Sequence, residues 1–516
     1  MQVIARALAA AGVFAALTGA AHAQGNFNTN GTVIYYDAVG NQTLDPQEPQ
    51  NNSSFAQGML MAIYDSLIYL DPKGVPTPGL AESWSYNADL TQFTMKLRAG
   101  VTFHDGAPFN AEAVKKNFDR TIALGNRAGF ASQETMAAIS AIEVTGPMEI
   151  RVTLKEANGQ MPYLFGTQAG MMIAPSSLEG HPFGAQIKPV GAGPYRVRSF
   201  ESNTRTVTTR NDAYWGGAAG RPAVLEHQFV PDSRARLNAL RSGQANVVLI
   251  DPRQINEAKQ AGLQVQVNEK NSTWDIYMNV KRDNISKLKL RQAMMHGLDR
   301  EALVEALGFG ASMSTAQLFA SSAPIYMKEL DSLYPYDPAK AKKLLAEAGY
   351  PDGVDVNWLL LNTPEYRALA EAIQAMLADV GIRMKFDVVD ASQFVLFRRP
   401  PTRADVLMAR WGGRPDPLQV FQELVGTGGA FNPVGTATPE IDTLIDQGRK
   451  MTPDNPERLK VLRQIAQLAV VNVSNVPVMT RSNVYAYKPG CMIGLEPYLP
   501  AGDDRFNDIK MGKGCK

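Results

Sequence analysis

The chain has 516 residues, well above the usual domain size of about 100–200 residues, so two or three compact parts are expected. Hydrophobic residues make up 45% of it, which is ordinary for globular domains. Lys and Arg total 51 and Asp and Glu total 50, so no excess positive charge is available to gather nucleic acid or anionic lipid. Nucleic acid is therefore not an expected partner.

Residues 1–23 have the pattern of a cleavable export signal. Arg6 supplies the positive charge, residues 7–17 form an apolar core of the usual length, and residues 21–23 read Ala-His-Ala, a cleavage pattern. A membrane anchor, the alternative, needs roughly 20 apolar residues, whereas this run is interrupted at Thr18. No cysteine stands beside the cut, so we expect an exported, soluble protein that is not a lipoprotein.

The N-terminal half is expected to be rich in strands. Residues 32–36 predict a strand, residues 40–52 a polar loop, and the apolar stretch 59–70 a helix. Apolar and polar residues then alternate at 93–97 and again at 149–154, which is the strand period.

Residues 354–388 predict a β-α-β unit. An apolar strand at 354–361 is followed by Thr363 as a helix N-cap and Pro364 in the first turn. An apolar stripe at helical spacing runs up to Gly381, and residues 382–388 alternate as a half-buried strand. This unit belongs to an α/β fold.

Further helix starts are marked by capping residues. Asn110, Asp337 and Asp416 each precede an apolar periodic stretch, and a proline follows directly after the two aspartates. A buried strand is expected at 405–411, directly before the third of these helices.

The loop at 411–417 is a candidate binding loop because ligands of α/β sheets bind beyond the carboxyl ends of strands. Gly413 lets the backbone turn, and Arg414 offers a planar guanidinium suited to a carboxylate. The alternative is that Arg414 pairs with Asp416 or another nearby acid and is structural. The preceding Trp411 is a candidate for an aromatic side chain that lines the binding site or, equally, for a core residue.

The only two cysteines, Cys491 and Cys515, lie in the Pro/Gly-rich C-terminal tail. An oxidising compartment favours a disulfide between them, which by chain entropy contributes about 3 kcal/mol. The alternative is two free thiols.

The sequence shows no assembled catalytic centre. The chain has five histidines, one of them in the predicted signal, and none has metal-ligand spacing. A phosphate loop and a Gly-x-Ser-x-Gly elbow are both absent, and residues 191–194 read as a turn. We therefore expect neither an enzyme, nor a metal site, nor a cofactor.

Five sequence blocks, in chain order, resemble the bacterial extracellular solute-binding proteins of family 5, which are periplasmic receptors of ABC importers for oligopeptides, dipeptides, nickel chelates and opines. The similarity runs from about residue 31 to residue 490. The blocks are LTQFTMKLRAGVTFHDGAPFNAEAVKKNFDR (90–120), VGAGPYRVRSF (190–200), RNDAYWGG (210–217), KLKLRQAMMHGLDREALVEALGFG (287–310) and YDPAKAKKLLAEAGYPDG (336–353).

The resemblance implies an α/β, two-lobe periplasmic-binding-protein clamp of type II, similar to cluster C, with an extra subdomain. The extended stretches 272–280 and 476–487 are expected to be the two crossings between the lobes. The implied division is a signal peptide at 1–23, lobe I at 24–273 with an inserted subdomain at about 75–185, an α/β lobe II at 274–480, and a C-terminal segment at 481–516 that returns to lobe I.

The implied function is that of a periplasmic binding component that captures a small peptide-like or carboxylate-bearing solute and delivers it to a membrane permease. Implied partners are the ABC permease and ATPase subunits, with the protein as a monomer. The alternatives are a nickel or metal-chelate receptor of the same family and a periplasmic peptidase.

Peptide-binding relatives carry an aspartate for the peptide's amino group at or next to the position of Arg414. Dipeptide-binding relatives also carry an arginine just before the helix that begins here at Pro364, where this chain has Leu360, Leu361 and Asn362. We therefore expect the solute to present a carboxylate to Arg414 and not to be an ordinary dipeptide. The candidate ligand contacts are Arg414, Trp411, Gly413, Trp274, Thr273, Asn41 and Thr43.

Overall fold

The structure is a computed structural model and describes residues 27–48, 57–128, 130–180, 183–390, 404–410, 413–429, 432, 435–493 and 509–515. The predicted export signal, Trp411 and Gly412 lie outside the described residues.

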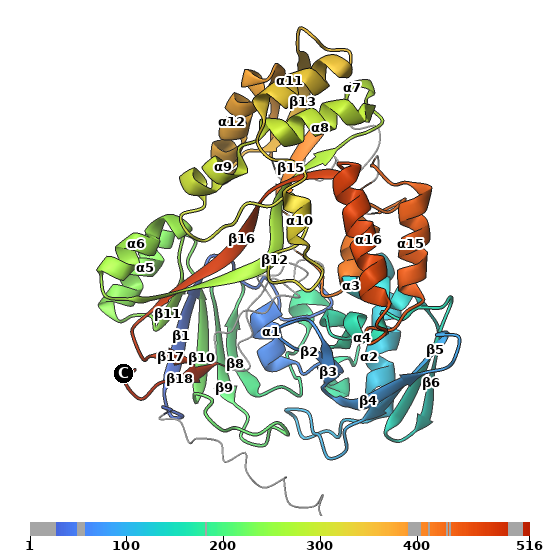
Figure 1. Cartoon of the computed structure of the whole chain (residues 1–516). Coiled ribbons are helices and arrows are strands. Elements are labelled where there is room, and N and C mark those ends of the chain that lie inside the picture. Colours follow the sequence, from blue (N-terminus) through green and yellow to red (C-terminus); the bar gives the residue numbers. More distant parts are fainter. Residues whose placement is uncertain are drawn as a thin grey trace, which may run out of the picture.

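One large sheet runs through both halves of the molecule (Figure 1). Its central strands, β12 and β16, are long and antiparallel, and they lie between a group of strands from the C-terminal half and a group from the N-terminal half. In spatial order the described strands are β14 (Ile382–Val389), β13 (Val354–Leu361), β15 (Val406–Arg410), β12 (Gln264–Met278), β16 (Asn475–Tyr487), β11 (Val247–Leu249), β1 (Thr32–Asp37), β10 (Val224–Phe229), β9 (Arg205–Arg210) and β8 (Tyr195–Glu201).

The upper half in Figure 1 contains the predicted β-α-β unit. Strands β13 and β14 pair in parallel, and α12 (Pro364–Asp379) connects them. Thr363 caps α12 by accepting a hydrogen bond from the backbone N of Tyr366, and Gly381 ends the turn with φ 92°. The other helices of this half are α7 (Asp283–Ser286), α8 (Leu288–Gly297), α9 (Arg300–Leu307), α10 (Lys328–Asp331), α11 (Pro338–Glu347), α14 (Pro417–Leu424), α15 (Pro439–Arg449) and α16 (Arg458–Val471).

The lower half holds the other end of the large sheet and a separate antiparallel sheet in the order β4-β5-β7-β6. That smaller sheet lies within the subdomain predicted at about 75–185, whose boundaries stay a prediction. Its strands are β4 (Ala81–Tyr86), β5 (Gln92–Leu97), β6 (Ile139–Gly146) and β7 (Glu149–Leu154); the helices of this half are α1 (Gln57–Ile63), α2 (Ala111–Leu124), α3 (Phe130–Ala137), α4 (Met161–Leu164), α5 (Ser233–Ser242) and α6 (Ile255–Gln260).

The expectation of one helix over 59–70 was wrong. Helix α1 ends at Ile63, and the chain continues as β2 (Ile68–Leu70), which pairs with β3 (Pro76–Pro78). The backbone N of Leu67 donates to the carbonyl of Gly170 instead of to a carbonyl one helical turn earlier. Tertiary hydrogen bonds therefore override the helical preference of this apolar run. Sequence periodicity alone does not distinguish a short buried helix from a buried strand.

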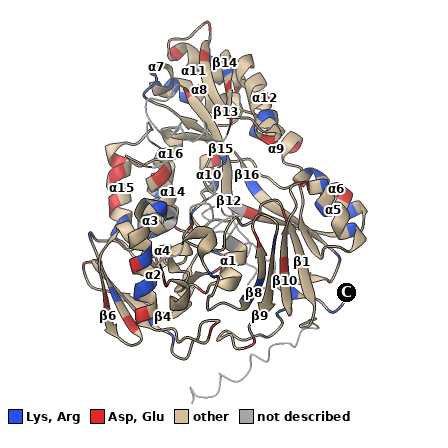
Figure 2. Ribbon diagram, turned by 180° about the vertical axis from the view of Figure 1, so that it is seen from behind, with Lys and Arg blue, Asp and Glu red and all other residues tan. Residues whose placement is uncertain are grey.

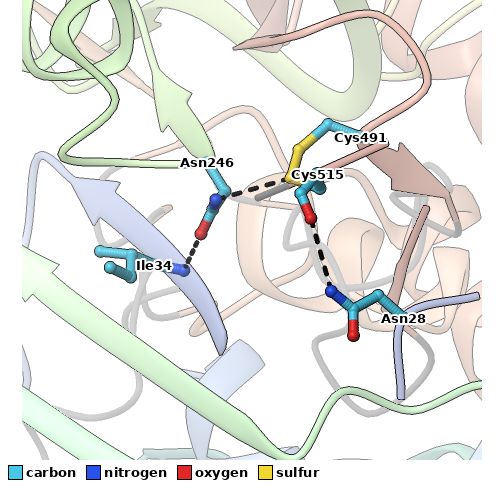
Figure 3. The surroundings of a disulfide bond; sticks show 5 residues. All are labelled: Asn28, Ile34, Asn246, Cys491 and Cys515. Atoms are coloured by element: carbon cyan, nitrogen blue, oxygen red, sulfur yellow. Dashed lines mark hydrogen bonds between the residues drawn. A yellow bond between two sulfur atoms is a disulfide. The ribbon is translucent and has the colours of Figure 1, made fainter. Parts of the chain in front are cut away.

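The C-terminal tail returns to the lower half, where Cys491 and Cys515 form a disulfide (Figure 3). Asn246 holds this region in place, because its side chain donates to the Cys515 sulfur and accepts from the backbone N of Ile34. Asn28 donates to the carbonyl of Cys515 at 3.4 Å. Strands β17 (Met492–Ile493) and β18 (Lys510–Met511) pair next to the disulfide.

In the part of the chain that the structure describes, no helix combines the length and the hydrophobicity needed to span a bilayer.

Candidate functional site

Strands β12 and β16, which overlap the stretches 272–280 and 476–487 predicted to be crossings, run between the two halves (Figure 1). The pairing runs from Gln264–Tyr487 at one end to Tyr277–Asn475 at the other, so β12 begins earlier than expected. Strand β11 continues the sheet at the first end and β15 at the second. The register shifts after Lys270 and again after Trp274, and such irregularities bend and twist a strand pair locally.

Thr273 and Trp274, two of the predicted site residues, lie at these irregularities. Successive strand residues point to opposite faces of a sheet, so the two side chains do not share one pocket wall. The Thr273 hydroxyl donates to the Asp275 carboxylate at 2.6 Å. Burial raises the pKa of Asp275 to about 7, and the hydrogen bond from Thr273 opposes that rise.

Trp274 is an aromatic platform between two arginines. Trp274 is only 5% exposed, and its ring packs edge-on against Tyr366, with 4.9 Å between the ring centroids. The guanidinium carbons of Arg410 and Arg481 each lie 5.8 Å from the Trp274 ring centroid, which is cation–π range. We call Trp274, Tyr366, Arg410 and Arg481 the Trp274 cluster.

Positive charge in the Trp274 cluster exceeds the negative charge beside it. The Arg410 guanidinium is 3.4 Å from the exposed carboxylate of Glu365, whereas among the described residues Arg481 donates to the Ser272 hydroxyl, also at 3.4 Å. No carboxylate of the described residues forms an ion pair with Arg481. Burial lowers the pKa of Arg481 to about 10, and the positive charge of Arg410 acts in the same direction.

Arg414 is already paired. Its guanidinium makes a two-pronged contact with Glu423, with Nε 2.7 Å and Nη2 2.8 Å from the two carboxylate oxygens. Glu423 is only 5% exposed in its side chain, whereas Arg414 is 24% exposed. The ion pair that the alternative expected is present, with Glu423 and not Asp416 as the acid. The role of Arg414 in ligand binding stays a prediction, while Gly413 has the positive φ, 74°, that favours glycine.

Asp416 connects the two halves of the molecule. It is fully buried, caps α14 through the backbone N of Leu418, and accepts hydrogen bonds from Arg458 at 2.6 Å and Gln160 at 2.9 Å. Gln160 precedes α4 in the N-terminal half, and the neighbouring Gly159 donates its backbone N to the carbonyl of Arg449 at 2.7 Å. We call this set of bonds the α4–α14 contact.

Asn41 and Thr43 lie in the loop after β1 and are buried within the N-terminal half. The Thr43 hydroxyl accepts a hydrogen bond from the backbone N of Asp45. Asp45 itself is fully buried and forms an ion pair with Arg120, with 2.6 Å between Nη2 and Oδ2, and it accepts from the backbone N of Gly184. These bonds hold the loop in a defined shape, and its contact with a ligand stays a prediction.

Comparison with known proteins decides the family. The profile of the bacterial extracellular solute-binding proteins, family 5 Middle, matches residues 75–432. The chain belongs to this family. Glutathione-binding protein GsiB of Salmonella choleraesuis (strain SC-B67) is 30% identical over 361 residues, which cover 69% of this chain and 69% of GsiB.

Solved structures of solute-binding proteins share the fold. NikA from Brucella suis in complex with Fe(III)-EDTA superposes with a TM-score of 0.83 at 24% identity, over 93% of this chain and 100% of NikA. DppA from Helicobacter pylori in complex with the peptide STSA gives 0.78 at 20% identity, over 94% of this chain and 99% of DppA. The type II fold predicted for this solute-binding protein is therefore confirmed.

Sequence reasoning missed Arg410, Arg481 and Tyr366. Arg410 directly precedes Trp411, the residue to which the prediction gave the aromatic role. Arg481 is the only charged residue in the predicted strand 476–487, and a lone charge in a buried strand is a signal that was available. Among the described residues, no group of three or more His, Cys, Asp or Glu side chains is placed to hold a metal ion.

Proposed function

We propose that this solute-binding protein is the periplasmic component of an ABC importer and captures a small, peptide-like, carboxylate-bearing solute between its two halves. It passes that solute unchanged to the membrane permease, which works with an ATPase subunit. The observation that carries the proposal is the junction itself, where two strands connect the halves and two arginines flank a tryptophan.

The two-strand junction supports hinge closure as the capture step. Closure about a few residues at the ends of connecting strands is a common domain motion, and the register shifts in β12 supply a place for it. Only a solute that contacts both halves stabilises the closed form, because a ligand shifts an equilibrium only by its differential affinity.

The relatives support a peptide-like cargo. The relative GsiB carries glutathione in its name, and the DppA structure is a complex with the peptide STSA. Glutathione is a tripeptide with two carboxylates, which is the chemistry that a cluster of arginines binds well. The metal-chelate alternative is not favoured, since the curated relative at 30% identity is named for glutathione.

The remaining parts of the proposal follow from the sequence. The export pattern at 1–23 supports a periplasmic location without a lipid anchor. The sequence shows no assembled nucleophile and base, which supports binding without turnover. The proposed working form is a monomer.

Native mass spectrometry of the protein as purified, followed by calorimetry with glutathione, tests the proposal. We expect one small solute per chain, or a 1:1 isotherm with glutathione, and the same solute recovered intact after incubation. Light scattering on the same sample checks the monomer. Hydrolysis of an added tripeptide by the purified protein would contradict the proposal, as would the absence of any bound peptide-like solute together with no binding to a panel of tripeptides.

A further inference from the structure

We infer that Arg410 and Arg481 together receive a carboxylate of the bound solute, with Trp274 as the surface on which the two guanidinium groups are held. This inference rests on the proposed function and assigns the place where the solute's negative charge is recognised.

Neighbouring strands bring the two arginines together. Arg410 ends β15 directly opposite Trp274 of β12, and Trp274 in turn lies opposite Met479 of β16, two residues before Arg481. Both guanidinium groups thus reach the same tryptophan ring from opposite sides of β12. Figure 2 shows a blue segment of β16 where the strand passes between the two halves, and Arg481 is the one basic residue of that strand.

The charge balance leaves a place for one anion. The cluster has two positive charges, and Glu365 is the described carboxylate beside it, 3.4 Å from Arg410 and on an exposed side chain. Arg253 also lies near Glu365 but is matched by Asp251, with 2.7 Å between Nη2 and Oδ2. Two partly buried like charges repel each other, so a carboxylate bound between them relieves repulsion as well as forming bonds.

Both arginines are accessible to a small ligand. The Arg410 side chain is 35% exposed and Arg481 is half-buried, so neither is sealed in the core. A guanidinium held against an aromatic ring has lost part of its freedom before the ligand arrives, which favours binding. A planar carboxylate matches the planar fork of each arginine, and a peptide-like solute carries at least one.

This assignment differs from the one that the sequence suggested. Arg414 donates Nε and Nη2 to the buried Glu423 and Nη1 to the carbonyl of Gly413, so its charge is already matched and its two-pronged edge is taken. Arg481 of the Trp274 cluster has no ion pair with a carboxylate of the described residues.

The test compares matched probes on matched variants. Calorimetry measures the binding of two peptides, glutathione and trialanine, each as the free acid and as the C-terminal amide. The proteins compared are the wild type, Arg410→Gln, Arg481→Gln and the double variant. Arg383→Gln is the control, because it removes one positive charge from an exposed ion pair with Asp355. Thermal unfolding of every variant shows whether the fold is kept. A further variant, Arg481→Lys, retains the positive charge without the planar guanidinium.

The wild type and Arg383→Gln are expected to prefer the free acid of at least one probe by about tenfold or more, which is the scale of a charge-assisted hydrogen bond. The double variant should still bind the amide, and its affinities for acid and amide should agree to within about twofold. A folded double variant that keeps the full preference for the acid overturns the inference and leaves the proposed function intact. Equal binding of trialanine and its amide by the wild type also overturns the inference, because glutathione amide still carries the carboxylate of its glutamyl residue. A wild type that binds neither these probes nor a panel of tripeptides, and that carries no peptide-like solute as purified, contradicts the proposed function and with it the inference.

Discussion

Two groups of arginines lie near the junction of the halves, and they differ in how their charges are matched. In the first group, Arg414 pairs with Glu423 and Arg458 pairs with Asp416, each at 2.6–2.8 Å. In the second, the Trp274 cluster, Arg481 has a hydroxyl partner and Arg410 a single exposed carboxylate at 3.4 Å. Removing one member of a matched, buried ion pair leaves an uncompensated buried charge, whereas two arginines without matched acids are available to an incoming anion.

The largest expected effect lies in the matched group. Asp416→Ala removes the partner of Arg458, whose side chain is only 3% exposed, and leaves a buried positive charge uncompensated. We expect the free energy of unfolding to fall by about 3–5 kcal/mol, as is typical when one member of a buried ion pair is removed. Urea unfolding measures it, with Asp212→Ala as the control because that aspartate is 75% exposed beside Arg210. Equal stability of the two variants would contradict the structural role of Asp416.

The disulfide is the next largest contribution. Replacing both Cys491 and Cys515 by serine should lower the free energy of unfolding by about 3 kcal/mol, because the cross-link restricts the unfolded chain. Binding of solute should be preserved. The complementary measurement is a thiol titration of the unreduced, denatured wild type, in which two reactive thiols would show that the bond is absent.

Arg414→Gln tests whether the matched arginines contribute to stability and not to solute binding. It leaves the Glu423 carboxylate without its main partner, so we expect a loss of about 1–3 kcal/mol in stability and at most a small change in solute affinity. Denaturation and calorimetry on the same preparation measure both quantities. A tenfold loss of affinity at unchanged stability would instead restore Arg414 to the role predicted from sequence.

The last prediction concerns a slope, the dependence of stability on pH, at Asp275. Its folded pKa of about 7 lies above the ordinary value of 3.8, so its neutral form is favoured by folding. The stabilisation is present below pH 4 and is lost as the pH rises towards 7, at no more than about 1.4 kcal/mol per pH unit. Asp275→Asn should therefore show a shallower fall in unfolding free energy between pH 4 and pH 7 than the wild type. Identical slopes would rule out this titration.

Much of the fold could be predicted because local signals and tertiary structure agree. Apolar periodicity and the residues that begin and end helices predict strand β13, the cap at Thr363 and strand β14. The end of α1 could not be predicted, since the bonds that turn the chain at 64–68 come from residues about 100 positions away, such as Phe165 and Gly170.

The site was harder to predict for a physical reason. Loop position and residue type identified Arg414 as a candidate, but charge matching depends on which acid a fold brings near. Glu423 lies in the last turn of α14, the helix that follows Arg414, and is buried against it. Arg410 and Arg481 become neighbours only through the order of the strands in the sheet. Trp274 was predicted as a contact residue, and the structure places it between those two arginines.

A crystal structure of the solute-loaded protein tests the central claim most directly. The account predicts a solute carboxylate within about 3 Å of a guanidinium nitrogen of Arg410 or Arg481, with the Arg414–Glu423 pair intact. A carboxylate bound to Arg414 with Glu423 displaced, and the Trp274 cluster out of contact with the solute, would contradict it.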